Sequence, residues 1–113
     1  MRTFLLVPVL AVLGCESTQC KVGEVASVTV SVFDASGAPQ IADVVTYTVD
    51  GEDRGECEPL DEAGTEFTCG VEESGAFVIT VEVGGFLFNE AVEVGMAADG
   101  CHVQGEFIEI DAA

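Results

Sequence analysis

The sequence is poor in basic residues. It contains 3 lysines and arginines against 21 aspartates and glutamates, which gives a formal net charge of −18 at pH 7. Proteins that bind nucleic acids rely on cationic side chains to neutralise phosphates. The composition therefore excludes direct binding to nucleic acid.

Residues that commonly carry out catalysis are also scarce. The chain has no tryptophan, one tyrosine and one histidine, His102. A general base needs a nucleophile within reach and a group that orients it. The sequence contains no Gly-x-Ser-x-Gly turn or other nucleophile signature. We therefore expect a non-enzymatic protein without a catalytic residue or a cofactor, and we expect His102 to lie on the surface.

Good helix formers are nearly absent. In residues 15–113, leucine, lysine, arginine, glutamine and methionine together number eight, whereas valine alone numbers 15. Enrichment in β-branched residues with frequent glycine favours strands. Because 49% of the residues are hydrophobic, the chain can bury a core in spite of its charge. We predict one all-β domain of six or seven short strands over residues 26–110.

Alternation of apolar residues with mostly polar ones indicates where several strands lie. It is found in residues 27–32, 44–49, 66–72 and 77–83. A last strand is expected from Cys101 to Ile110. Its apolar phase changes near Gly105, so we predict a β-bulge at that residue.

The dipeptide Gly84-Gly85 predicts a tight hairpin. Both residues tolerate the positive φ angles that a two-residue type I′ turn requires. The turn sets the register and leaves Glu90 as the single polar residue on the apolar face. The predicted pairs are Val83 with Phe86, Val81 with Phe88, Ile79 with Glu90 and Phe77 with Val92.

The N-terminal segment has the pattern of a secretory signal peptide. Arg2 is followed by ten residues, 4–13, that are apolar or proline. This run is too short for a membrane span, which needs roughly 20 apolar residues. The alternative is a buried N-terminal strand.

Residues Val12-Leu13-Gly14-Cys15 resemble the lipobox of bacterial lipoproteins. The resemblance implies a signal peptide over residues 1–14. It also implies that Cys15 becomes the N-terminus and carries a thioether-linked diacylglycerol and an N-acyl chain, enough for stable anchoring. In that family an aspartate after the cysteine favours the inner membrane. Because Glu16 stands there, we expect anchoring in the outer membrane.

Short motifs along the chain resemble carboxypeptidase regulatory-like domains. Residues 32–44 contain their strand, aspartate and Gly-x-Pro turn, and residues 74–81 followed by Gly85-Phe86 resemble a later strand. Residues 99–103 resemble the segment that opens the last strand in secreted members. Bacterial immunoglobulin-like domains share the Asp-x-x-Gly-x-Pro turn, and the choice between the two families stays open. Both imply a non-catalytic Greek-key β-sandwich.

Four cysteines remain once Cys15 is lipidated. An even number in an exported chain predicts two disulfides, with three connectivities. Cys57 and Cys69 are close in sequence and flank one turn, so we expect them to pair, and Cys20 would then pair with Cys101. A zinc site is the alternative, but no Cys-x₂-Cys pair is present.

Residues 50–62 are strongly acidic. Ca²⁺ takes six to eight oxygen ligands, so an alternative function is a divalent-cation-binding surface protein. Against it, Arg54 occupies a ligand position and no helices flank the segment. We expect instead a solvated acidic hairpin that keeps the protein soluble. The candidate Ca²⁺ ligands are Asp50, Glu52, Asp53 and Asp61.

These patterns together predict a lipid-anchored module of the cell envelope with an interaction or structural role. Its partners would be the membrane, through the anchor, and an envelope protein or polysaccharide; the oligomeric state stays open. Residues 15–25 would form the lipidated N-terminus and a short tether. The five steps from Cys15 to Cys20 span under roughly 20 Å, so the domain should lie close to the lipid surface.

Overall fold

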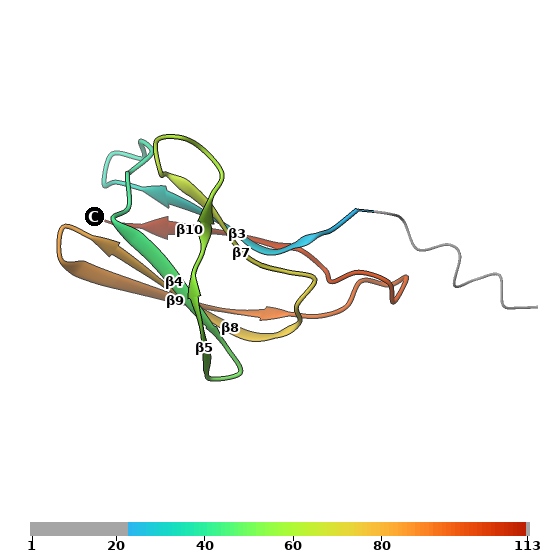
Figure 1. Cartoon of the computed structure of the whole chain (residues 1–113). Coiled ribbons are helices and arrows are strands. Elements are labelled where there is room, and N and C mark those ends of the chain that lie inside the picture. Colours follow the sequence, from blue (N-terminus) through green and yellow to red (C-terminus); the bar gives the residue numbers. More distant parts are fainter. Residues whose placement is uncertain (1–22, 113) are drawn as a thin grey trace, which may run out of the picture.

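The computed structural model describes residues 23–112, and all regular secondary structure within them is β (Figure 1). Eight strands form two four-stranded sheets, with the orders β10-β3-β7-β6 and β5-β4-β8-β9. The all-β prediction is confirmed, but the described residues contain eight strands and not six or seven. Their bounds are β3 Ala26–Phe33, β4 Val44–Val49, β5 Glu52–Glu56, β6 Glu58–Pro59, β7 Glu66–Val71, β8 Gly75–Val83, β9 Phe86–Val94 and β10 Glu106–Asp111.

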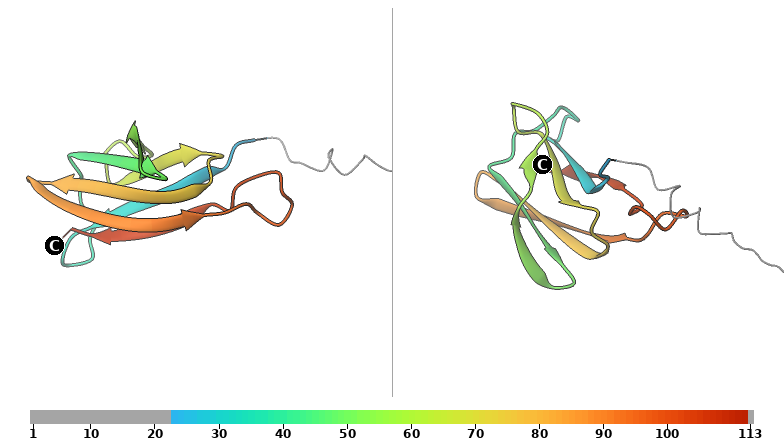
Figure 2. Two further views of the ribbon diagram at one scale, coloured as in Figure 1. Left: turned by 90° about the horizontal axis from the view of Figure 1, so that it is seen from below. Right: turned by 45° about the vertical axis from the view of Figure 1, so that its right-hand side comes forward.

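The chain crosses repeatedly between the two sheets. β3 pairs with β7 in one sheet and β4 pairs with β8 in the other, both antiparallel. The connections from β3 to β4 and from β7 to β8 therefore each pass from one sheet to the other (Figure 2). β10 returns to lie parallel to β3 and forms an edge of the first sheet.

One hydrophobic core fills the space between the sheets. It is built from alternate residues of the strands, because the strand period of two sends every second side chain inward. Each fully buried valine, isoleucine or phenylalanine contributes about 1.5–3 kcal/mol. Tyr47 stacks on Phe77 at the margin of this core. The least exposed apolar residues are Val28, Val30, Val32, Val45, Val49, Cys69, Phe77, Ile79, Val81 and Val94.

The β8–β9 hairpin has the predicted register. Val83 pairs with Phe86 and Phe77 pairs with Val92, without a bulge between them. Gly84 and Gly85 adopt φ angles of 58° and 87°, as a type I′ turn requires. The prediction of this hairpin is confirmed.

β5 and β6 lie within the acidic segment and were not predicted as strands. Asp50 and Gly51 both have positive φ angles and turn the chain from β4 into β5. After β5 the chain leaves this sheet and joins the other as β6, with Cys57 at the crossing. The sequence Glu-Asp-Arg-Gly-Glu of β5 has no apolar residue, so alternation gives no signal there.

The last strand is shorter than predicted. β10 begins at Glu106, and Val103 forms an isolated bridge with Met96 instead of joining the strand. No bulge occurs at Gly105. A Cβ at this residue would lie 3.0 Å from the carbonyl oxygen of Ala26, so glycine permits a close approach to the start of β3.

Candidate functional site

The sandwich has two distinct ends. We call residues 23–25, 72–74 and 95–105 the entry end, because the described part of the chain enters β3 there. Residues 34–43, 84–85 and 111–112 lie at the opposite, far end (Figure 1). Any anchor at the N-terminus would therefore connect to the entry end, and the far end would point away from it.

Glu72 holds the entry end together. Its own N–H donates to the carbonyl oxygen of Val25, at 2.9 Å. Its carboxylate accepts from the N–H of Val25 and from the N–H of Val103, and its Oε2 lies 2.5 Å from Nδ1 of His102. The hydrogen bond from His102 lowers the pKa of Glu72. This side chain therefore joins the start of β3, the end of β7 and the loop 95–105.

His102 is not the surface residue that the sequence suggested. Its side chain is 15% exposed and faces the carboxylate of Glu72. The two residues lie 30 positions apart, so only the path of the chain between the sheets brings them together. The pair connects the residue that follows β7 to the loop 95–105.

The loop 95–105 is ordered by its own hydrogen bonds. The N–H of Ala97 donates to the carbonyl of His102, and the N–H of Gln104 donates to the carbonyl of Gly95. The carboxylate of Asp99 accepts from the N–H of Cys101, and this bond lowers the pKa of Asp99. These hydrogen bonds give the loop 95–105 a defined conformation at the entry end.

One of the two predicted disulfides lies wholly within the described residues. Cys57 and Cys69 are bonded, with their Cα atoms 4.5 Å apart, as expected. Cys69 is fully buried on β7, and the N–H of Cys57 donates to the carbonyl of Val45. The bridge therefore fixes the point at which the chain changes sheets.

The other cysteine predictions reach outside the described residues. Cys101 is disulfide-bonded, but Cys20 lies outside residues 23–112, so their pairing stays a prediction. Cys15, the predicted lipidation site, also lies outside the described residues. The structure thus describes one complete bridge, not two.

Three of the four candidate Ca²⁺ ligands lie at the β4–β5 turn or in β5, the fourth lies between β6 and β7, and each is held by protein groups. Asp50 accepts from the N–H of Ala76, Asp53 accepts from the N–H of Gly55, and Glu52 pairs with Arg54. Asp61 accepts from the N–H groups of Gly64 and Thr65 and from the hydroxyl of Thr65. Within residues 23–112, no three acidic, histidine or cysteine side chains are grouped so that they could hold a metal ion.

Asp61 is the most strongly perturbed of these carboxyl groups. Its hydrogen bonds, the one from the Thr65 hydroxyl foremost, lower its pKa to about 2. A carboxylate that accepts several N–H and O–H bonds is stabilised in its charged form. Asp61 therefore closes the turn between β6 and β7.

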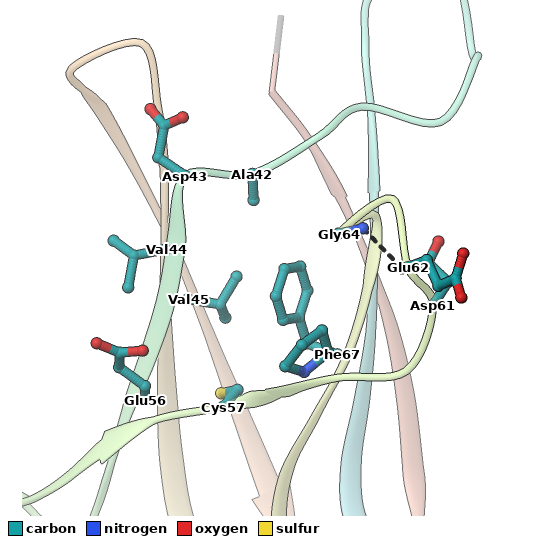
Figure 3. A pocket seen from close by; sticks show the side chains of 11 residues that line it. Ala42, Asp43, Val44, Val45, Glu56, Cys57, Asp61, Glu62, Gly64 and Phe67 are labelled. Atoms are coloured by element: carbon teal, nitrogen blue, oxygen red, sulfur yellow. Dashed lines mark hydrogen bonds between the residues drawn. The ribbon is translucent and has the colours of Figure 1, made fainter.

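A groove of about 370 Å³ opens beside this turn. It lies between β4 and the β6–β7 connection, with Val45 and Phe67 pointing into it and four acidic residues among those that line it (Figure 3). Its floor belongs to the hydrophobic core, and no buried polar group is directed into it. The acidic residues are Asp43, Glu56, Asp61 and Glu62.

Positive charge is confined to one side chain on the described surface. Arg54 is the only lysine or arginine in residues 23–112, against 20 acidic residues. Its guanidinium lies 3.0 Å from Glu52 and 2.6 Å from Glu73. The rest of the surface is therefore strongly negative.

Comparisons with known proteins do not identify a family. No protein-family model matches the chain, and no curated protein and no solved structure gives a match. The resemblances to lipoproteins and to the two sandwich families therefore stay predictions. Among the described residues, no helix has the length and apolar character that a membrane crossing requires.

Proposed function

We propose that the protein is a lipid-anchored module of the cell envelope with a non-enzymatic interaction or structural role. The observation that carries the proposal is the lipobox-like sequence ending at Cys15, eight positions before the first described residue, Gly23. The anchored cysteine thus precedes the entry end of a small folded domain by a short segment. The paired strands β3/β7 and β4/β8, with a crossing between sheets after β3 and after β7, support a Greek-key β-sandwich.

The arrangement of the two ends supports an orientation relative to the membrane. With the anchor at Cys15, the entry end would lie against the lipid surface. The nine residues of β8 span about 30 Å at 3.3 Å per residue. The far end would then stand about that distance further from the lipid, where it is accessible to other envelope components. Because Glu16 follows the cysteine, we place the anchor in the outer membrane.

The acidic surface of the domain is unfavourable next to a membrane that contains anionic lipids. Anionic head groups repel a negatively charged domain within a screening length of about 8 Å at physiological salt. We infer that divalent cations at the surface, or a cationic partner, offset this repulsion. No grouping of side chains in the described residues favours the alternative of a dedicated Ca²⁺ site.

Metabolic labelling with a fatty-acid analogue tests the anchor. The wild-type chain should be labelled and should sediment with membranes, whereas Cys15→Ser should lose the label because no thiol accepts the diacylglycerol. Cys20→Ser is the matched control, since it removes a neighbouring cysteine and should retain the label. Equal labelling of the wild type and Cys15→Ser would refute the lipid anchor.

A further inference from the structure

The two sheets end in four edge strands, and three of these are short, irregular or strongly charged. The register of β5 with β4 shifts between Tyr47 and Thr48. β6 has two residues, one of which is Pro59. β10 has six residues, and three of them are acidic. Features of this kind keep edge strands from pairing with other chains.

β9 is the exception. It is the longest of the four edge strands and pairs regularly with β8 over nine residue pairs. Its sequence, Phe-Leu-Phe-Asn-Glu-Ala-Val-Glu-Val, contains no proline, glycine or lysine. In the part of the chain that the structure describes, no strand pairs with its outer edge.

The turn at Gly84-Gly85 determines which backbone groups point outward. In a two-residue hairpin the flanking residues, Val83 and Phe86, form a hydrogen-bonded pair, and hydrogen-bonded pairs then recur at every second residue. The residues between them direct their N–H and C=O groups away from β8. These residues are Leu87, Asn89, Ala91 and Glu93, and all four are exposed.

The spacing of these groups identifies the class of ligand. N–H and C=O groups that alternate along a strand are matched only by the backbone of another extended polypeptide, which adds to the sheet edge. We propose that residues 86–94, the β9 edge, form a docking site at which an extended, basic segment of another protein adds as a fifth strand. The inference deepens the proposed interaction role but does not depend on the lipid anchor.

Charge determines which segment fits. Glu90 pairs with the buried Ile79, so it occupies the inner register of an edge strand, where a carboxylate discourages apolar strands from adding. Glu93 lies on the same strand, and Glu82 stands opposite Leu87 on β8. An arginine or lysine placed across from a glutamate on adjacent strands is favourable.

The same charges disfavour a second copy of this chain as the occupant. Two β9 strands paired antiparallel would bring their glutamates close together. Like charges directly opposite each other destabilise a strand pair, and each domain carries 20 acidic residues against Arg54. The edge therefore fits a different, positively charged partner.

Exposed apolar side chains complete the surface. Phe86 is 72% exposed and Leu87 is 65% exposed, at the far end of the β9 edge. Phe88, on the same face as Phe86, is partly buried. An added strand would cover them, and burying such apolar area is favourable. The fitting segment thus has a basic residue across from Glu90 and apolar residues across from Phe86 and Phe88.

A synthetic peptide with this pattern provides the test. The peptide Lys-Val-Thr-Lys-Thr-Val-Thr-Leu, labelled with a fluorophore, is titrated with the full chain in detergent, and the anisotropy is followed. Saturable binding is expected, with amide signals of residues 87–93 shifting in NMR spectra. A peptide with glutamate in place of both lysines should bind at least about tenfold more weakly.

Two pairs of variants separate edge pairing from general attraction between charges. The N–H of Ala91 points away from β8, so Ala91→Pro keeps the β8–β9 ladder but blocks strand addition. It should weaken binding at least about tenfold, whereas Ala91→Ser should not. Glu90→Lys with Glu93→Lys should also weaken it at least about tenfold, but Glu58→Lys with Glu62→Lys, the same charge change on β6 and the β6–β7 connection, should have little effect.

Several outcomes would overturn the proposal. The edge is no docking site if the wild type shows no saturable binding, or if Ala91→Pro binds as tightly as Ala91→Ser. Dimers of the wild type in sedimentation experiments that disappear in Ala91→Pro would assign the edge to a second copy instead. Fatty-acid labelling is unaffected by all of these results, so the lipid anchor and the docking site fail independently.

Discussion

Glu72 and His102 face each other at the entry end, with Oε2 of the glutamate 2.5 Å from Nδ1 of the histidine. Glu72 adopts a positive φ of 52°, which is unfavourable for most residues. Its carboxylate also accepts the N–H groups of Val25 and Val103. The strained backbone is therefore compensated by contacts that join three segments, and this carboxylate helps to fix the position of loop 95–105.

Replacing this carboxylate should loosen the entry end. Glu72→Gln has one acceptor oxygen instead of two and no charge to pair with His102. We expect the amides of Val25 and Val103 to exchange hydrogen several-fold faster than in the wild type. Glu24→Gln, which removes an exposed carboxylate from the same end, is the control. Unchanged exchange at both amides would show that Glu72 does not hold the loop.

Acid should destabilise the protein partly through Asp61. Its pKa is lowered from 3.8 to about 2 in the folded chain, so its contribution is fully present above the unfolded pKa and is lost as pH falls through about 2. The difference in urea midpoint between the wild type and Asp61→Asn should therefore be largest above about pH 4 and shrink towards pH 2. Glu62→Gln serves as the neighbouring control. A difference that stays constant over this range would contradict the prediction.

Gly75 should be the glycine least tolerant of substitution. Its φ is 137°, and a Cβ would lie 2.9 Å from Val49 Cγ1 and from Asp50 Oδ2. We expect Gly75→Ala to lower the free energy of unfolding by about 1–3 kcal/mol. Gly95→Ala, where no atom lies within 4 Å and φ is not positive, should change it by less than about 0.5 kcal/mol. Urea unfolding of both variants checks this, and equal effects would count against it.

The bridge between Cys57 and Cys69 should stabilise the fold. It closes a loop with a sequence separation of 12 residues, for which the chain-entropy model gives about 3 kcal/mol. Replacing both cysteines by alanine should lower the free energy of unfolding by about this amount. Reduction with dithiothreitol should lower the stability of the wild type more than that of the variant, because the variant has no bridge between positions 57 and 69 to lose, whereas the bridge of Cys101 is reduced in both. A double variant as stable as the wild type would contradict the prediction.

The parts of the fold that the sequence revealed are those in which local pattern and tertiary environment agree. Alternation identified the inner faces of β3, β4, β7 and β8, and the glycine pair identified the β8–β9 turn. β5 was missed because an edge strand can be held by backbone hydrogen bonds alone, without apolar side chains. The last strand was predicted to begin too early because an apolar residue, Val103, can also be buried when it lies in a loop.

The candidate sites were harder to predict than the fold. The groove lined by Val45 and Phe67 combines residues from the two sheets, and the pair Glu72 and His102 combines residues from two separate connections. Their proximity follows from the crossings between the sheets, which no local pattern encodes. The open β9 edge had a signal in the sequence: Glu90 interrupts an otherwise apolar face. The sequence alone did not show that β9 is an edge strand, so this glutamate could not be linked to an open sheet edge.

The last prediction concerns how the anchored domain stands on a membrane. An extended tether from Cys15 to Cys20 reaches less than about 20 Å. Cys101, the predicted disulfide partner of Cys20, lies in the entry-end loop. The entry end should therefore stay near the lipid, with the far end further away by the length of β8, about 30 Å. Fluorescent amino acids introduced at Ala98, in loop 95–105, and at Ala35, at the far end, report these two distances through energy transfer to a lipid-bound acceptor. Both positions are exposed.

Transfer should be stronger from position 98 than from position 35. Removing Mg²⁺ with a chelator should weaken transfer from both positions, because the negative surface is then less well screened from anionic lipid. Vesicles of neutral lipid are the control, since chelation should have no effect on them. Equal transfer from the two positions would show that the domain lies flat on the membrane. Separation unaffected by chelation on anionic vesicles, without a partner present, would show that divalent cations do not offset the repulsion.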